Sequence, residues 1–346
     1  MRSDSMRAVV ITGPNKASLQ EVGRMVPVPG EVLVRCHTAA ICTAERRVFS
    51  GHMRYYPMIG GHEFTGIVER VDGLEIDLEP GDRVAIDAST RCGRCYYCVK
   101  GRNNQCVKMF EFRHDYDYYQ MGGGFGEYVA LRPSQMIKLA DHVDLEEASV
   151  LEPLACCIHS LKRAQIRFGE TVLVIGAGTM GGMHVMLAKL AGASVIVSDI
   201  DPVRLAQAGQ LGADRTVNPE TEDLVAIVKD LTAGRGADGV IVAASSRGAG
   251  EQGLRCVGRT GRLVFYASLH PSGMLDLDWN RVHYEEIVIT GTEGHTDQDF
   301  HEAVALVSNG SVSVRTLISK VISLEELPAE LGSRPAGETQ RVVVRL

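Results

Sequence analysis

Four of the nine cysteines stand close together in the chain, as Cys92, Cys95, Cys98 and Cys106. The spacing Cys-x2-Cys-x2-Cys-x7-Cys brings four thiolates within reach of one tetrahedral zinc ion, which would hold a loop that has no core of its own. Because four thiolates leave no position open for a substrate, we expect this zinc to be structural. An iron–sulfur cluster is the main alternative, and four unrelated loop cysteines are a less favoured one.

A glycine-rich motif, Gly176-Ala-Gly178-Thr179-Met180-Gly181, follows an apolar run and opens a helical pattern. In that context the glycines permit a tight turn, a close approach of the backbone to a pyrophosphate, and close packing of helix on strand. Asp199 ends the next strand, where a carboxylate would bind a ribose 2′-hydroxyl and repel a 2′-phosphate. We therefore predict an NAD site, although Arg204 could accept a phosphate. The simpler alternative is an ordinary turn of an α/β domain.

A third set of residues is dispersed along the chain: Cys42, His62, Glu63 and Glu152. Each is ordinary when taken alone. A single cysteine is most often a small buried hydrophobe, and a single histidine or glutamate most often makes a structural hydrogen bond. These residue types by themselves do not establish a second metal site.

Strands and helices alternate around the glycine-rich motif. One helix begins at Asp201-Pro202, a capping aspartate followed by the proline that favours a first helical turn. Such alternation is typical of βαβ units on a parallel sheet. The apolar strand-like runs lie at 171–175, 194–199, 239–243, 262–267 and 287–292.

The first third of the chain is instead rich in short β-like runs, separated by glycine and proline turns. The four cysteines lie in a long irregular stretch at about 89–124. We predict one helix from Asp144 to Ala164 and another from Thr296 to about Asn309, each opened by a capping residue. The tail ends in the strand-like run Arg341–Arg345, and we expect it to pack on the front. The β-like runs are 7–12, 31–37, 61–71, 83–86 and 125–131.

Composition limits the class of protein. The 346 residues suggest about two domains, and 45% hydrophobic and 23% charged residues indicate a globular chain with a sizeable core. These values exclude a disordered protein, no run is long enough for a membrane span, and a net charge of −7 argues against nucleic acid as partner. No signal peptide is evident, so we expect a cytoplasmic protein whose remaining cysteines are packed thiols: Cys36, Cys156, Cys157 and Cys256.

Taken in chain order, the motifs resemble those of the zinc-dependent medium-chain dehydrogenases, the superfamily of alcohol, polyol and threonine dehydrogenases. The resemblance covers essentially the whole chain. A glutamate at position 152 is similar to the sorbitol and threonine dehydrogenase branch. The motifs are Ile41-Cys42, Gly61-His62-Glu63-Phe64-x-Gly66, Pro80-Gly81-Asp82-Arg83-Val84, the four cysteines, Gly123-Gly-Phe125-Gly-Glu127-Tyr128 and Glu152-Pro153-Leu154.

The resemblance implies an α/β chain with two domains. Residues 1–152, completed by a return segment at 295–346, would form a GroES-like β-rich catalytic domain. Residues 153–294 would form a Rossmann domain with a doubly wound parallel sheet. Members of this family commonly form dimers and tetramers through the nucleotide domain, so we expect a homo-oligomer.

The resemblance also implies two zinc ions per chain and bound NAD. Cys42 and His62 would hold the catalytic zinc together with Glu152 or Glu63, leaving one position open for the substrate. The zinc would lower the pKa of an alcohol, and hydride would pass to the nicotinamide. The residues implied to line the NAD site are Met180 within the glycine-rich motif and, beyond the motif, Asp199, Arg204, Tyr266, Ala267, Ser268, Thr292 and Glu293.

The chain departs from the family pattern next to Cys42. Where the family has Cys-Gly-Thr/Ser-Asp, this chain has Cys42-Thr43-Ala44-Glu45, so Ala44 cannot supply the hydroxyl that relays the substrate proton. Thr43 or a water would have to serve instead. Arg47 stands where threonine dehydrogenases carry a relay histidine. Arg46 or Arg47 could pair with an anionic substrate, although a solvated surface pair is the simpler interpretation. The segment 113–120 could shape the substrate pocket or an oligomer contact.

We therefore expect a zinc-dependent oxidoreductase that transfers hydride between NAD and a polar secondary alcohol, such as a polyol, sugar, cyclitol or hydroxy amino acid, to give the ketone. One alternative is a zinc-free reductase of the same superfamily, which would need neither the dispersed ligands nor the four cysteines. The other is a non-catalytic NAD-binding zinc protein, which would need the nucleotide and structural zinc sites but not Cys42, His62 and Glu152.

Overall fold

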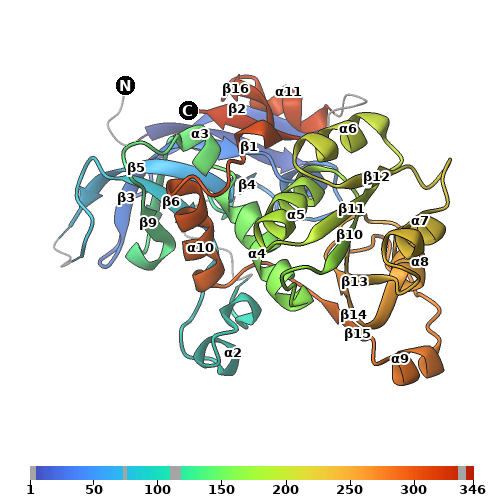
Figure 1. The fold of residues 1–346 in the computed structure, drawn as a ribbon. Helices are drawn as coiled ribbons and strands as arrows, with labels where there is room; N and C mark the ends of the chain where they lie inside the picture. The colour runs from blue at the N-terminus through green and yellow to red at the C-terminus, as the bar shows by residue number, and fades with distance from the viewer. Residues whose placement is uncertain (1–4, 73–75, 110–117, 334–339) are drawn as a thin grey trace. The chain divides into compact units, whose positions relative to one another are not determined.

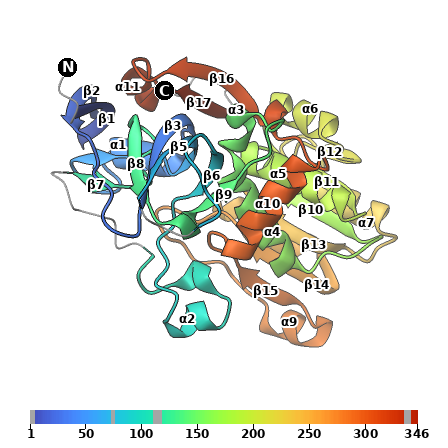
Figure 2. The same cartoon turned by 90° about the vertical axis from the view of Figure 1, so that its left-hand side faces the viewer.

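The computed structural model describes residues 5–72, 76–109, 118–333 and 340–346. The chain divides into two compact units (Figures 1 and 2), unit 1 with Met1–Ala155 and Thr296–Leu346, and unit 2 with Cys156–His295. The first boundary falls inside α4 (Leu151–Ala164), a few residues beyond the position expected from the sequence. Within the described residues, no helix has the length and apolarity needed to cross a bilayer.

Unit 1 is the β-rich part, and its larger sheet joins the front of the chain to the tail. The last strand lies antiparallel beside an N-terminal one, with Val343 opposite Ala40, so the tail packs on the front as predicted. The larger sheet has the order β16 (Ile318–Ser323), β17 (Arg341–Arg345), β3 (Val32–Ala40), β5 (Glu63–Val71), β6 (Arg83–Asp87) and β9 (Met136–Lys138), with β8 (Tyr128–Leu131) also paired to β3. The smaller sheet has the order β2 (Lys16–Gly23), β1 (Ser5–Gly13), β4 (Met58–Ile59) and β7 (Tyr119–Gln120).

The helices of unit 1 connect these strands along the chain, and most of them are short. The single helix predicted from Asp144 to Ala164 is in fact two, α3 (Leu145–Ala148) and α4. The Asp144 carboxylate caps the start of α3 by accepting from the Glu146 amide at 2.9 Å. At the other end of α3, the Ser149 hydroxyl donates to the Glu146 carbonyl at 2.7 Å. The other helices are α1 (Thr43–Phe49), α2 (Tyr96–Val99), α10 (Asp297–Ser308) and α11 (Leu327–Gly332), with 3₁₀ turns at Asn103–Gln105, Pro133–Gln135 and Arg315–Leu317.

Unit 2 is built on one parallel sheet, as the alternation of strands and helices predicts. Its strand order places β10 at the centre, with the next two strands on one side and the last three on the other, which is the doubly wound Rossmann arrangement. The order is β12 (Arg215–Val217), β11 (Ser194–Ser198), β10 (Thr171–Ile175), β13 (Ala237–Val242), β14 (Val257–Phe265) and β15 (Val288–Gly291).

Alternate residues of the sheet pack against helices on its two faces (Figure 1). Val172 and Val174 belong to one buried cluster, whereas Leu173 and Ile175 belong to the other. The predicted cap is confirmed at α6, where the Asp201 carboxylate accepts from the Val203 amide at 2.8 Å. The helices of this unit are α5 (Thr179–Leu190), α6 (Pro202–Gln210), α7 (Leu224–Leu231), α8 (Arg247–Cys256) and α9 (Trp279–Glu285).

Candidate metal and nucleotide sites

Cys42 lies at the turn where β3 passes into α1, as the N-cap residue of that helix. Glu45, one turn into α1, is fully buried and reaches back to this turn. Its carboxylate accepts from the Cys42 amide at 3.1 Å, from the Gly61 amide at 3.0 Å and from the imidazole Nδ1 of His62 at 2.7 Å. One buried carboxylate thus joins the cysteine turn to the histidine that stands just before β5.

The contact between Glu45 and His62 decides which imidazole nitrogen remains available. A proton on Nδ1 donates to Glu45, which leaves Nε2 on the other side of the ring as a potential ligand. Burial opposes ionisation of both groups, but their mutual attraction outweighs it and lowers the pKa of Glu45 while raising that of His62 well above its usual value. The pair is therefore an oriented, electron-rich imidazole of the kind that binds metal ions.

Glu63 begins β5 and completes a group of three potential ligands. The Cys42 sulfur, a His62 nitrogen and a Glu63 carboxylate oxygen lie within 4.8 Å of one another. Glu63 is fully buried; its Oε1 accepts from Arg341 Nη2 at 2.5 Å, but its Oε2 has no hydrogen-bond partner among the described residues. A buried carboxylate oxygen left without a partner costs free energy, and a metal ion held with the thiol and imidazole would remove that cost. The donor set fits zinc.

Arg341 on β17 was not found from the sequence. It is 9% exposed, and its Nη2 lies 3.7 Å from the Cys42 sulfur as well as against Glu63. Burial raises the pKa of Cys42, but Arg341 and His62 outweigh burial and bring that pKa down to about 7. The thiolate needed for a metal ligand is thus accessible near neutral pH.

Glu152 lies in the first turn of α4, close enough for its charge to contribute to the raised pKa of Glu63, which burial causes first. Its carboxylate is not one of the ligand atoms of Cys42, His62 and Glu63 that lie within 4.8 Å of one another. Of the two glutamates considered from the sequence, the structure therefore brings Glu63 to Cys42 and His62.

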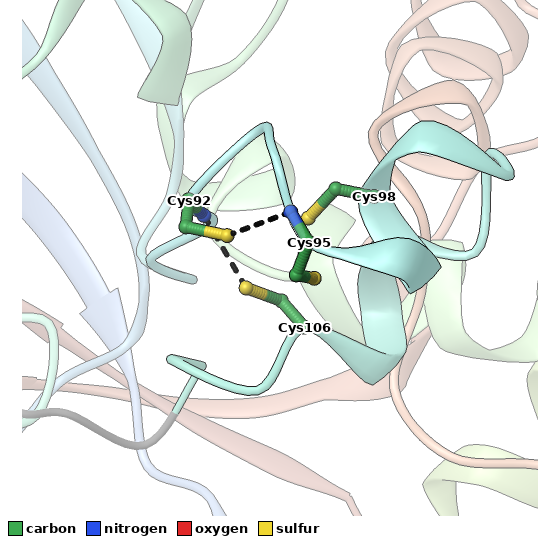
Figure 3. Close-up of side chains that lie close together, drawn as sticks. All are labelled: Cys92, Cys95, Cys98 and Cys106. Atoms are coloured by element: carbon green, nitrogen blue, oxygen red, sulfur yellow. Dashed lines mark hydrogen bonds between the residues drawn. The ribbon is translucent and has the colours of Figure 1, made fainter.

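The four clustered cysteines converge as the spacing predicts (Figure 3). Their sulfur atoms lie within 4.8 Å of one another, and all four are free thiols. Backbone amides already point at the sulfurs: Cys95 N lies 3.4 Å from Cys92 Sγ, and Cys92 N lies 3.3 Å from Cys106 Sγ. Two further backbone amides, those of Cys98 and Val107, lower the pKa of Cys95 to about 6. The arrangement fits a closed tetrathiolate metal site.

The residues next to Cys42 have distinct surroundings. Thr43 is exposed at the start of α1, and Ala44 is packed against the core. Arg46 donates from Nη1 to the carbonyls of Glu330 at 2.7 Å and Leu331 at 3.2 Å. The interpretation of Arg46 as a solvated surface residue is therefore wrong, because its guanidinium holds the end of α11. Of the segment 113–120, residues 113–117 lie outside the described part of the chain.

The glycine-rich loop of unit 2 fits a dinucleotide. Gly176 has φ +102°, and a Cβ there would lie 2.9 Å from the Ala244 amide; a Cβ at Gly181 would lie 1.9 Å from the Gly176 carbonyl. A Cβ at Gly178, by contrast, would meet nothing within 4 Å. The first and third glycines are thus required by packing, and the second leaves open space through which a pyrophosphate can approach the backbone.

The remaining residues of the expected nucleotide site follow the carboxyl ends of parallel strands, which lie at one edge of the sheet. Asp199 follows β11, and its carboxylate accepts from the amides of Ala177 at 2.7 Å and Asp201 at 2.9 Å. Arg204 lies in α6, with its Nε 3.7 Å from Asp201 Oδ2. Thr292 follows β15, and its buried hydroxyl has no hydrogen-bond partner among the described residues. Tyr266, Ala267 and Ser268 follow β14, and Glu293 follows Thr292.

We expect Glu45→Gln to weaken metal binding at the Cys42 group by about 10- to 100-fold, the usual effect of losing an outer carboxylate behind a ligating histidine. Glutamine keeps the size of the side chain and an acceptor oxygen but removes the negative charge behind His62. Competition with a chelator, read by metal content, measures the change. Glu45→Asp, which keeps the charge, is the control; equal metal retention in the glutamine variant and the wild type would contradict the role assigned to Glu45.

Comparison with known proteins finds two family models on this chain. One, an alcohol dehydrogenase GroES-like domain, matches residues 28–141, and the other, a zinc-binding dehydrogenase, matches residues 179–309. The chain is 31% identical to L-threonine 3-dehydrogenase of Pyrococcus furiosus over 99% of both chains. It is 30% identical to D-arabitol-phosphate dehydrogenase of Enterococcus avium over 94% of this chain and 93% of the relative.

A solved structure shares both the fold and part of the sequence. It is a protein from Sinorhizobium meliloti 1021, described as a zinc-binding dehydrogenase and bound to NADP. The TM-score is 0.91, the sequence identity is 30%, and 99% of each chain is covered.

Proposed function

Because the chain belongs to the zinc-type medium-chain dehydrogenase family, we propose that it is a zinc-dependent oxidoreductase that transfers hydride between NAD and a polar secondary alcohol to give the ketone. The observation that carries the proposal is the meeting of Cys42, His62 and Glu63 within 4.8 Å, with one buried carboxylate oxygen that lacks a hydrogen-bond partner among the described residues. A zinc-free reductase has no use for such a group, and neither has a non-catalytic protein.

The side chains around Cys42, His62 and Glu63 have different roles in the proposed mechanism. A zinc ion held by Cys42, His62 and a glutamate would supply Lewis-acid activation of the alcohol oxygen. Glu45 orients His62, and Arg341 holds one oxygen of Glu63 while favouring the thiolate of Cys42. Arg341 neutralises part of the charge of Glu63, so Glu63 can either bind the metal or remain paired with Arg341 while Glu152 binds. The proposal therefore allows either glutamate as the third ligand.

For the cofactor, the proposal favours NAD. Asp199 presents a carboxylate, 8% exposed, at the end of β11, and a second negative charge on a ribose 2′-phosphate would be repelled there. The relative from Sinorhizobium meliloti binds NADP, so both nucleotides belong in any test.

For the substrate, the relatives named for threonine and arabitol phosphate support a small polar secondary alcohol, with an anionic group as one option. Arg46 is already engaged by α11, so an anionic substrate would have to use Arg47 of the two arginines. The nine free cysteines support a reducing cytoplasm as the place of action.

The first experiment is the zinc content of purified, gently dialysed protein, followed by a screen of polyols, sugars, cyclitols and hydroxy amino acids with NAD and NADP. We expect two zinc ions per chain and turnover of a secondary alcohol with NAD. One zinc, lost when the clustered cysteines are replaced, would leave only the structural site and overturn the proposal.

Thr43 is our candidate for the hydroxyl that Ala44 cannot provide. It is exposed at the first position of α1, one residue after Cys42. We expect Thr43→Val to lower kcat at neutral pH about 100-fold, the lower end of the range for general acid–base groups, whereas Ala44→Gly leaves kcat nearly unchanged. Steady-state kinetics on the two variants provides the measurement. Equal kcat values in both variants would exclude a relay through Thr43.

We also propose that the protein forms a homo-oligomer through unit 2. β15 ends the six-stranded sheet, so its outer edge is unpaired within the sheet, and Val288 on it is 51% exposed. Trp279 and Tyr284 on the neighbouring α9 are 80% and 73% exposed. A second copy pairing at this edge would cover both features. Sedimentation velocity should show a dimer or tetramer, and a monomer at micromolar concentration would exclude it.

A further inference from the structure

His184 is a buried histidine that neither the metal group nor the glycine-rich motif accounts for. It lies in α5, is fully buried, and its Nδ1 lies 2.7 Å from the carbonyl oxygen of Met180. Because a carbonyl only accepts, Nδ1 carries the proton and donates. The other ring nitrogen, Nε2, is buried and has no hydrogen-bond partner among the described residues.

Burying an imidazole with one unpartnered nitrogen costs free energy that an aliphatic residue at this place would not. Burial also lowers the pKa of His184 to about 4, so the ring is neutral at physiological pH. A neutral imidazole has one donor nitrogen and one acceptor nitrogen in fixed directions, and here the donor, Nδ1, binds the Met180 carbonyl. The role of His184 must therefore come from the groups that its ring contacts.

One further contact joins His184 to the segment after β14, and Cys157 contacts both partners of His184. The ring of Tyr266 stands edge-to-face on the imidazole, with centroids 4.7 Å apart and planes at 80°. The thiol of Cys157 in α4 lies 3.6 Å from the Met180 carbonyl and 3.9 Å from the Tyr266 hydroxyl. All four residues belong to unit 2, and together they tie α4, the first turn of α5 and the carboxyl end of β14 to one another.

Met180 and Tyr266 are the two members of this cluster that reach the sheet edge where the nucleotide is expected. Met180 is the second variable residue after Gly178 in the glycine-rich motif, and Tyr266 directly follows β14. His184 contacts both of them: it donates to the backbone carbonyl of Met180 and packs against the ring of Tyr266. Displacing either would change the wall of the site without touching Asp199 or Arg204.

We propose that His184 is a positioning residue for the nicotinamide half of the cofactor, acting through Met180 and Tyr266, with Cys157 as a second support. The inference rests on the proposed function, because it needs a nicotinamide nucleotide in this site. Asp199 and Arg204 follow β11, which lies on the other side of β10 from β14, so the adenosine half that they would bind does not depend on His184. The two halves of the cofactor should therefore respond differently when the imidazole is replaced.

The test compares binding of NADH, followed by its fluorescence, with binding of ADP-ribose, followed by displacement calorimetry, on the zinc-loaded full chain. His184→Leu should weaken NADH about 5- to 10-fold, the loss of one hydrogen bond or one aromatic contact, and leave ADP-ribose unchanged. His184→Asn keeps a donor near the position of Nδ1, and His184→Phe keeps a ring against Tyr266; each should restore part of the affinity. Leu161→Ala, a packing change in α4, is the control for general loosening of unit 2.

The outcomes separate the two proposals. Failure of the wild type to bind either nicotinamide nucleotide overturns both the proposed function and the role of His184. If the wild type binds NADH and His184→Leu weakens NADH and ADP-ribose by the same factor, or weakens neither, the role of His184 alone is overturned. A loss confined to NADH, partly rescued by asparagine or phenylalanine in a chain that melts as the wild type does, supports it.

Discussion

A Cys42→Ser variant should carry one zinc ion per chain instead of two and lose about 10³-fold or more in kcat/KM. The sulfur of Cys42 is one of three ligand atoms that meet within 4.8 Å, and its pKa of about 7 makes the thiolate available. A serine hydroxyl does not ionise near neutral pH, so the site would keep only His62 and a glutamate. Losing the Lewis acid removes several kcal/mol of stabilisation from the transition state, and about 4 kcal/mol corresponds to the expected factor.

The matched control is Cys36→Ala. Cys36 lies on β3, the strand that leads to Cys42, and is 2% exposed, but it belongs to none of the potential ligand groups found in the described residues. It should keep both zinc ions and turnover close to the wild type. Metal analysis and steady-state kinetics measure both effects. Two zinc ions and wild-type turnover in the Cys42 variant would show that the Cys42 group is not the catalytic metal site.

Much of the fold could be predicted from local sequence patterns. The capping sequences at Asp201 and Thr296 predict the starts of α6 and α10, and both are confirmed by side-chain oxygens that accept from backbone amides. The alternation of strands and helices predicts the parallel sheet of unit 2, which is confirmed by its strand order. These signals lie within a few residues of the elements they define, so a single sequence contains them.

Elements without such signals were missed. α1 begins directly after β3, at a cysteine rather than at one of the usual capping residues, and its cap is completed by Glu45. The break between α3 and α4 falls at Ser149, whose hydroxyl donates to the backbone carbonyl of Glu146. Neither feature stands out in composition or periodicity.

The site illustrates the same limit at longer range. Arg341 meets Glu63 across 278 positions of sequence, because β17 happens to pair with β3 beside β5. The only local sign is an arginine at the start of an apolar strand, a place where a buried charge needs a partner. The four clustered cysteines, by contrast, lie within 15 residues and were recognised from spacing alone. Sequence proximity, and not chemical importance, decided what could be predicted.

A Cys106→Ser variant should lose the other zinc ion and lower the melting temperature by about 10 °C. The four cysteines define a small lobe, residues 92–108. Cys106 is 6% exposed and accepts from the amides of Cys92 and Lys108, so it links both ends of this lobe. Among the described residues of that lobe, α2 and the turn at Asn103–Gln105 are the only regular elements, and together they have little core. Loss of a structural metal is among the few single changes that cost more than about 4 kcal/mol, and in a unit of this size each kcal/mol shifts melting by about 2–4 °C.

The lobe also contacts the first turn of α10, so loss of its metal should affect that helix as well. Asn103 Nδ2 donates to Asp297 Oδ2 at 2.5 Å, and Arg91 Nη1 lies 2.8 Å from Asp297 Oδ1. We therefore expect faster hydrogen exchange at the start of α10 when Cys106 is replaced, with the zinc of the Cys42 group retained. Asn103→Ala is the matched control, since it cuts the link to α10 but spares the thiolates and should keep both zinc ions. If Cys106→Ser melted like the wild type, the metal in the lobe would not be structural, and the tetrathiolate site would need another explanation.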